Sequence, residues 1–117
     1  MIESEPQSYL HEEHHGVNIV TVPEGIAMND VNALTHRSVL IDLSLDPRCT
    51  SVVLNISEVE SIDSANLGMI VSARKRLKAA EKPFVVDYAG NIYIEKIFKF
   101  TGLDKVFEPI EAPESTI

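Results

Sequence analysis

The fold of this chain is decided by the stretch SVVLNISEVESIDSANLGMI at residues 51–70. Residues 51–56 are short, branched and mostly apolar, which predicts a strand buried on both faces of a sheet. After a turn over residues 57–61, Asp63 and Ser64 lead into an apolar pattern typical of a helix from about Ala65 to Ala80. A strand that leads into a helix predicts a unit of a parallel sheet.

Two further elements precede this stretch. Residues 17–22 alternate in polarity, and with Tyr9–Glu13 just before Gly16 they predict an opening hairpin. Asn29 is a candidate helix cap, and the helix that it starts cannot pass Pro47. The apolar residues expected on this helix are Val31, Leu34, Val39, Leu40 and Leu43.

The residues after the second helix predict another strand, Phe84–Tyr88, and a third helix, Ile92–Phe100. Gly102 is placed where a left-handed helix cap favours glycine, and Val106-Phe107 predict a last short strand. The expected fold is α/β, with a mostly parallel central sheet, an N-terminal hairpin and helices packed on the sheet. The expected core comprises Leu54, Ile56, Leu67, Ile70, Val85, Ile97 and Phe100.

Length and charge limit the classes of function. A chain of 117 residues forms one domain, for which we expect bounds of 8–110, with flexible segments at 1–7 and 111–117. The net charge of −8 disfavours nucleic acids and anionic membranes as partners. No apolar run approaches the ~20 residues of a membrane span, and the N-terminus lacks the pattern of a signal peptide. We therefore expect a cytoplasmic protein that is not bound to a membrane.

The sequence His11-Glu12-Glu13-His14-His15 matches the zinc-protease signature H-E-x-x-H. That signature works on a helix, where two histidines four residues apart bind one zinc ion. In an extended hairpin the same histidines would lie about 13 Å apart at ~3.3 Å per residue, too far to share an ion. We expect no metal site here.

Other catalytic patterns are weak. Ser64, Asp63 and His36 supply the residue types of a hydrolase triad, but no G-x-S-x-G elbow surrounds the serine. Cys49 follows Arg48, yet no further residues support a nucleophile, and a single cysteine forms no intramolecular disulfide. No glycine-rich phosphate loop is present. We expect neither an enzyme nor a cofactor.

Ser64 is the candidate functional residue. Its place at or beside the start of a helix favours a capping role, worth ~1 kcal/mol, on local pattern alone. A helix start also tolerates a phosphate, whose charge of about −1.5 to −2 would change what docks there. Gly68 costs the helix ~1 kcal/mol relative to alanine, so we expect the sheet or a partner to approach it closely.

At these residues the chain resembles the STAS family, the domain shared by anti-sigma factor antagonists and sulfate transporters. The family has an apolar strand followed by Asp-Ser-Ser/Thr-Gly-Leu-Gly at a helix start, and here Val52-Val53-Leu54-Asn55 precedes Asp63-Ser64-Ala65-Asn66-Leu67-Gly68. Residues 97–107, IFKFTGLDKVF, resemble the closing helix of the family and its Gly-Leu ending. The resemblance covers roughly residues 8–110 and favours phosphorylation at Ser64 over a merely structural serine.

The resemblance implies a regulator. A GHKL-type serine kinase that is also an anti-sigma factor would bind the unphosphorylated protein, phosphorylate Ser64 and then release it, and a metal-dependent serine phosphatase would reverse the reaction. The alternative is a constitutive STAS subunit of a membrane transporter ATPase that is never phosphorylated. The partner-binding surface that the resemblance implies comprises Asp63, Ser64, Ala65, Asn66, Gly68 and Met69.

Two departures from the family pattern affect this surface. Ala65 and Asn66 replace the second hydroxyl residue and the glycine, so we expect a partner to meet a protruding amide. Ala27 stands about where the family often has an acidic residue after its second strand.

Overall fold

The computed structural model describes residues 8–107, which form one mixed sheet with helices packed on it. The strand order is β1-β2-β3-β4, in which β1 and β2 are the antiparallel hairpin and the other two pairs are parallel. This confirms the predicted fold class. The strands are β1, Leu10–His14; β2, Val17–Thr21; β3, Ser51–Asn55; and β4, Phe84–Asp87.

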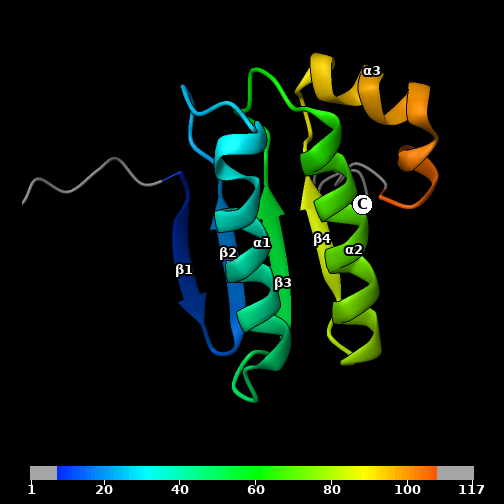
Figure 1. Ribbon diagram of the computed structural model, residues 1–117. Coiled ribbons are helices and arrows are strands. Elements are labelled where there is room, and N and C mark those ends of the chain that lie inside the picture. Colours follow the sequence, from blue (N-terminus) through cyan, green and yellow to red (C-terminus); the bar gives the residue numbers. More distant parts are fainter. Residues whose placement is uncertain (1–7, 108–117) are drawn as a thin grey trace, which may run out of the picture.

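Two long helices cover one face of the sheet, and a shorter helix lies across the end of β4 (Figure 1). Each of the three begins after an asparagine or aspartate whose side chain accepts a backbone amide, the pattern that favours a helix start. The helices are α1, Asp30–Leu45; α2, Ser64–Ala79; α3, Ile92–Thr101; and the 3-10 helix η1, Leu103–Lys105.

The core lies between the sheet and the helices, and α3 contributes Ile94 and Phe98 to it. In β3 the residues facing the helices are fully buried and those between them are half-buried, so the strand is covered fully on one face only. The prediction of full burial on both faces was therefore wrong. Val85 lies on the less covered face and is 38% exposed, which removes it from the core.

The other core predictions were partly correct. Leu54, Ile56 and Ile70 are fully buried, as predicted, while Leu67 and Ile97 are partly buried against the core. Phe100 was predicted to be buried but is 92% exposed. The inner face of α3 is set by Ile94 and Phe98, and a residue two positions after Phe98 points to the opposite side of the helix.

Helix α1 keeps part of the predicted buried stripe. Leu40 and Leu43 are buried and Val39 is partly buried against the core, as predicted. Val31 and Leu34 are instead 85% and 70% exposed, and the buried stripe also includes His36. The end of the helix is held by Lys82, whose Nζ donates to the carbonyl oxygens of residues 43, 44 and 46 at 2.8, 3.1 and 2.7 Å. This lysine comes from the loop after α2, so it joins the ends of two helices.

The predicted strand at Val106-Phe107 is absent from the described residues. Gly102 has the predicted left-handed backbone, with φ of 81°, and the chain turns there into η1. The amides of Val106 and Phe107 then donate to the carbonyl of Leu103, which bends the backbone instead of extending it. Phe107 is buried and stacks edge-on against Phe84, with ring centroids 5.9 Å apart.

Between residues 8 and 107 no helix has the length and apolarity that crossing a membrane requires. The segments predicted to be flexible, 1–7 and 111–117, lie outside the described residues.

Candidate functional site

The candidate site lies at the end of the sheet where the parallel strands finish and α1 and α2 begin. The loops that enter these helices are joined by a short parallel bridge between Met28 and Ile62. Met28 donates its amide to the carbonyl of Ser61 and accepts from the amide of Asp63, both at 2.9 Å. Residues at this end of an open α/β sheet form its usual ligand-facing edge.

Ser64 is the first residue of α2, and its side chain is exposed. The helix is capped by Asp63, whose Oδ1 accepts the amide of Asn66 at 2.9 Å. The expectation that the Ser64 hydroxyl caps the helix is therefore wrong. Within residues 8–107 no group forms a hydrogen bond with this hydroxyl, which leaves it accessible to a modifying enzyme.

The Asp63 carboxylate is held in its ionised form. Its pKa is lowered from the ordinary value of 3.8, first by the hydrogen bond from the Asn66 side chain and then by the Asn66 amide. Burial opposes this effect but is weaker. A negative charge therefore stands beside the Ser64 hydroxyl at neutral pH.

Asn66 does not protrude from the surface. Its side chain is completely buried, which corrects the expectation of an exposed amide. The Nδ2 group donates to the carbonyl of Asn29 at 2.9 Å and to Oδ1 of Asp63 at 3.0 Å. Its own Oδ1 lies 3.5 Å from Nδ1 of His36, a buried ring that also contacts the carbonyl of Ser8 at 3.0 Å. Asn66 therefore ties the starts of α1 and α2 together.

The remaining predicted surface residues divide between exposed and buried positions. Ala65 and Gly68 are exposed on the first two turns of α2, whereas Met69 is 5% exposed and belongs to the core. A side chain added at Gly68 would meet no atom within 4 Å, so the sheet does not approach it. Of the two expected explanations for Gly68, only close approach by a partner remains. The surface that a partner could contact comprises Asp63, Ser64, Ala65 and Gly68.

The H-E-x-x-H segment lies in β1 and its turn, not in a helix, and His15 has a left-handed backbone. His11 is bonded through Nε2 to Oδ1 of Asn18 at 2.7 Å. Within the described part of the chain no three His, Cys, Asp or Glu side chains are grouped to hold a metal ion.

The hydrolase triad is not assembled. His36 contacts Asn66 and Ser8, and the Asp63 carboxylate accepts from Asn66, so neither activates Ser64. Cys49 is buried, with Sγ 3.6 Å from the carbonyl of Ser51.

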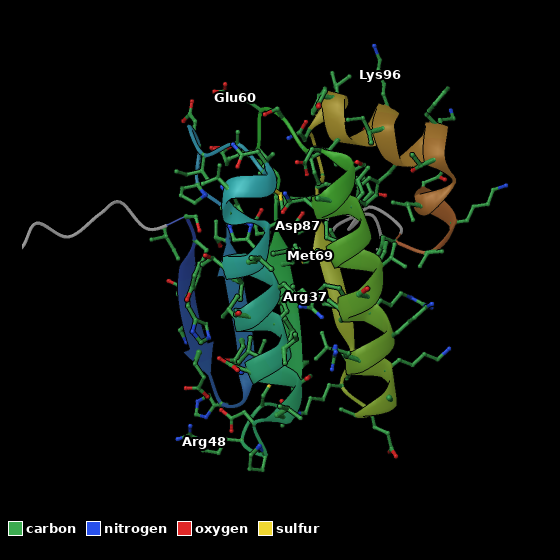
Figure 2. All side chains as sticks on the ribbon, in the orientation of Figure 1. Arg37, Arg48, Glu60, Met69, Asp87 and Lys96 are labelled. Carbon is green, nitrogen blue, oxygen red and sulfur yellow. The ribbon has the colours of Figure 1, made fainter. Side chains whose placement is uncertain are left out.

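An acidic groove of about 290 Å³ lies beside these loops, which the sequence reasoning did not locate. Its acids are Glu24, Glu58 and Glu60, contributed by the loops after β2 and β3; Glu60 stands at the end of the molecule where α1 and α2 begin (Figure 2). Asn91 shapes it by donating Nδ2 to the carbonyls of Ser57 and Val59 at 3.1 and 2.8 Å. The sequence signal for this groove was Gly90-Asn91 before a helix. That pair indicates a helix cap, but it does not indicate that Asn91 also binds the loop after β3.

Known proteins are similar to this chain in sequence and in fold. A Thermotoga maritima protein named "Putative anti-sigma factor antagonist" is 28% identical over 89 residues, which is 76% of this chain and 78% of that protein. An anti-sigma factor antagonist from Mycobacterium paratuberculosis has a structure similar at a TM-score of 0.75 and 25% identity, covering 92% of this chain and 87% of that one. The phosphorylated form of the Bacillus cell fate determinant SpoIIAA has the same fold, with a TM-score of 0.69 and 15% identity over 92% and 96% of the two chains.

The profile of the STAS domain matches residues 9–116, which is nearly the whole chain. This range includes the helix start at Ser64 and the Gly-Leu ending at residues 102–103. The chain belongs to the STAS domain family.

Proposed function

We propose that this protein is an anti-sigma factor antagonist whose affinity for its partner is switched by phosphorylation of Ser64. The observation that carries the proposal is the accessible hydroxyl at the first position of α2, with exposed Ala65 and Gly68 beside it. Relatives named as anti-sigma factor antagonists, together with a STAS protein known in a phosphorylated form, support this role.

The physical basis of the switch is charge at a docking surface. Asp63 is ionised, and Glu58 and Glu60 lie on the loop that leads to it. A phosphate of about −1.5 to −2 at Ser64 would add to this negative charge, and a partner that buries it without compensation would lose affinity. Unphosphorylated protein binds, and phosphorylated protein is released.

The partner is a GHKL-type serine kinase that also acts as an anti-sigma factor, and a metal-dependent serine phosphatase restores the binding form. In this role the protein is a regulatory component of the cytoplasm and catalyses no reaction. It needs no cofactor, because the kinase supplies the nucleotide and the metal ion.

The test uses the serine kinase encoded nearest to this protein, with ATP and magnesium. Ser64→Ala should bind the kinase like the parent and resist phosphorylation, whereas the matched control Ser61→Ala, three residues earlier and also exposed, should be phosphorylated normally. Ser64→Asp should bind at least about tenfold more weakly, which corresponds to about 1.4 kcal/mol.

Phosphosite mapping by mass spectrometry and binding by calorimetry provide the readouts. The proposal fails if Ser64→Ala is modified as fast as the parent, or if complete phosphorylation leaves the affinity unchanged. A parent protein that is not phosphorylated at all would favour the alternative, a constitutive STAS subunit of a transporter ATPase that is never phosphorylated.

A further inference from the structure

A groove of about 350 Å³ lies at the opposite end of α2 from Ser64. It is bounded by the C-terminal half of α2, the loop that enters β4, and the end of η1. Since α2 rises about 1.5 Å per residue, Arg74 lies about 15 Å from Ser64 along the helix. The groove is therefore separate from the candidate phosphorylation site. Its lining residues are Arg74, Lys78, Glu81, Lys82, Pro83, Phe84 and Val106.

The groove gathers positive charge in an acidic chain. Five of the ten lysines and arginines of the protein lie between residues 74 and 82, and three of these line the groove. Nitrogen-tipped side chains project from the C-terminal half of α2 (Figure 2). Lys82 is engaged with the end of α1, but Arg74 and Lys78 form no ion pair with any residue from 8 to 107. Glu81 is the single acid of the lining.

Apolar groups complete the lining. Phe84 is half-buried with its ring against Phe107, and Val106 is 45% exposed. An occupant that matches both features carries carboxylates for Arg74 and Lys78 and apolar side chains for Phe84 and Val106. A nucleic acid does not fit, because two free cations in a chain of net charge −8 would not offset repulsion of a phosphate backbone.

We propose that this groove binds an acidic segment of a partner protein, in which glutamates or aspartates alternate with apolar residues. Opposite charges would guide the segment to Arg74 and Lys78, and the apolar lining would add affinity by desolvation. Because the groove does not include Ser64, it is open in both phosphorylation states. The protein would then hold a second partner whether or not the first is released.

The test uses a short synthetic peptide in which glutamate alternates with leucine and serine, and a control peptide with glutamine in place of glutamate. Addition of the acidic peptide to the full-length protein should shift the amide resonances of Arg74, Phe84 and Val106, and the glutamine peptide should not. Shifts confined to other residues, or equal shifts with both peptides, would overturn the proposal.

Two charge-reversal variants distinguish binding in the groove from non-specific electrostatic attraction between the acidic peptide and the protein. Arg74→Glu/Lys78→Glu should weaken acidic-peptide binding at least about tenfold. Lys75→Glu/Arg76→Glu makes the same change in net charge on exposed residues outside the lining, and should weaken binding less than about twofold. Equal losses would overturn the proposal. Circular dichroism and thermal melting check that both variants fold alike.

Two further measurements test whether the groove is independent of Ser64 and whether the chain's own C-terminal segment occupies it. Ser64→Asp should bind the acidic peptide as the parent does, and a loss there would overturn the independence of the two surfaces. If the parent does not bind the peptide, but a full-length variant with glutamine at Glu108, Glu111 and Glu114 does, the C-terminal segment of this chain is the occupant and the partner proposal is overturned.

Discussion

The Asn66→Ala substitution tests how the start of α2 is built. Asn66 is fully buried and donates one hydrogen bond to a neutral carbonyl, that of Asn29, and one to the ionised carboxylate of Asp63. The first bond contributes about 1 kcal/mol and the second about 1.5–3 kcal/mol. Alanine returns about 0.6 kcal/mol through its higher helix propensity. The free energy of unfolding should therefore fall by about 2–3.5 kcal/mol.

Denaturant unfolding followed by circular dichroism measures this change. The midpoint should fall while the slope stays constant, because the surface exposed on unfolding is almost unchanged. Ser72→Ala is the control, since Ser72 is exposed on the same helix and should change stability by less than about 0.5 kcal/mol. A loss for Asn66→Ala no larger than that of the control would refute the view that its buried amide holds the two helix starts together.

Four further outcomes follow from the same structure. The pKa of Asp63 is lowered in the folded state from 3.8, so its contribution to stability is present above that pH and is lost as the pH falls through the lowered pKa; unfolding midpoints measured across this range should fall less in Asp63→Asn than in the parent, and equal slopes would count against the cap. Lys82→Met should cost about 1–2 kcal/mol because its ammonium binds three carbonyls at the end of α1, whereas Lys78→Met, which has no such contact, should cost less than about 0.5 kcal/mol. Leu54→Ala, at a fully buried position, should cost about 2–5 kcal/mol in the same assay, and an unchanged midpoint would discredit the placement of β3. Phe100→Ser should leave the midpoint within about 0.5 kcal/mol of the parent because the ring is 92% exposed, so a large loss would show that α3 packs differently.

Local signals in the sequence were sufficient for the four strands, the three long helices and their order, but not for the last element, where a strand was predicted at Val106-Phe107 and the structure has η1 before it. Short-range patterns of apolar residues predicted the hairpin, the three helices and the parallel strands. Asn29, Pro47 and Gly102 marked where helices begin or end. These signals succeed because each depends on the geometry of neighbouring residues. The same reasoning placed Ser64 at the start of α2, one residue beyond the cap that Asp63 provides.

Contacts between distant residues could not be read from local pattern. The carbonyl that Asn66 binds is 37 residues away in the sequence, and those that Lys82 binds are 36 to 39 residues away. An asparagine in a helix is usually solvent-exposed, so its burial follows only from the packing of α1 against α2. The predictions that Val85 and Phe100 are buried were wrong for a similar reason. The hydrophobicity of a residue does not show which face of a strand or helix the rest of the chain will cover.

The cap at Asp63 determines where the free energy of the proposed switch must arise. A phosphate at a helix start is usually stabilised by the free amides there, but Asp63 already accepts the amide of Asn66 through its side chain and the amide of Leu67 through its carbonyl. A phosphate on Ser64 would therefore meet a carboxylate beside it and find some of the amides of its own helix already engaged. Attraction to the helix dipole, about 0.3–1 kcal/mol, would be offset by repulsion from Asp63 of similar size at a solvent-exposed position. The folded protein itself would change little in stability, so discrimination between the two forms would have to come from the partner's surface, which must accept or reject the added charge.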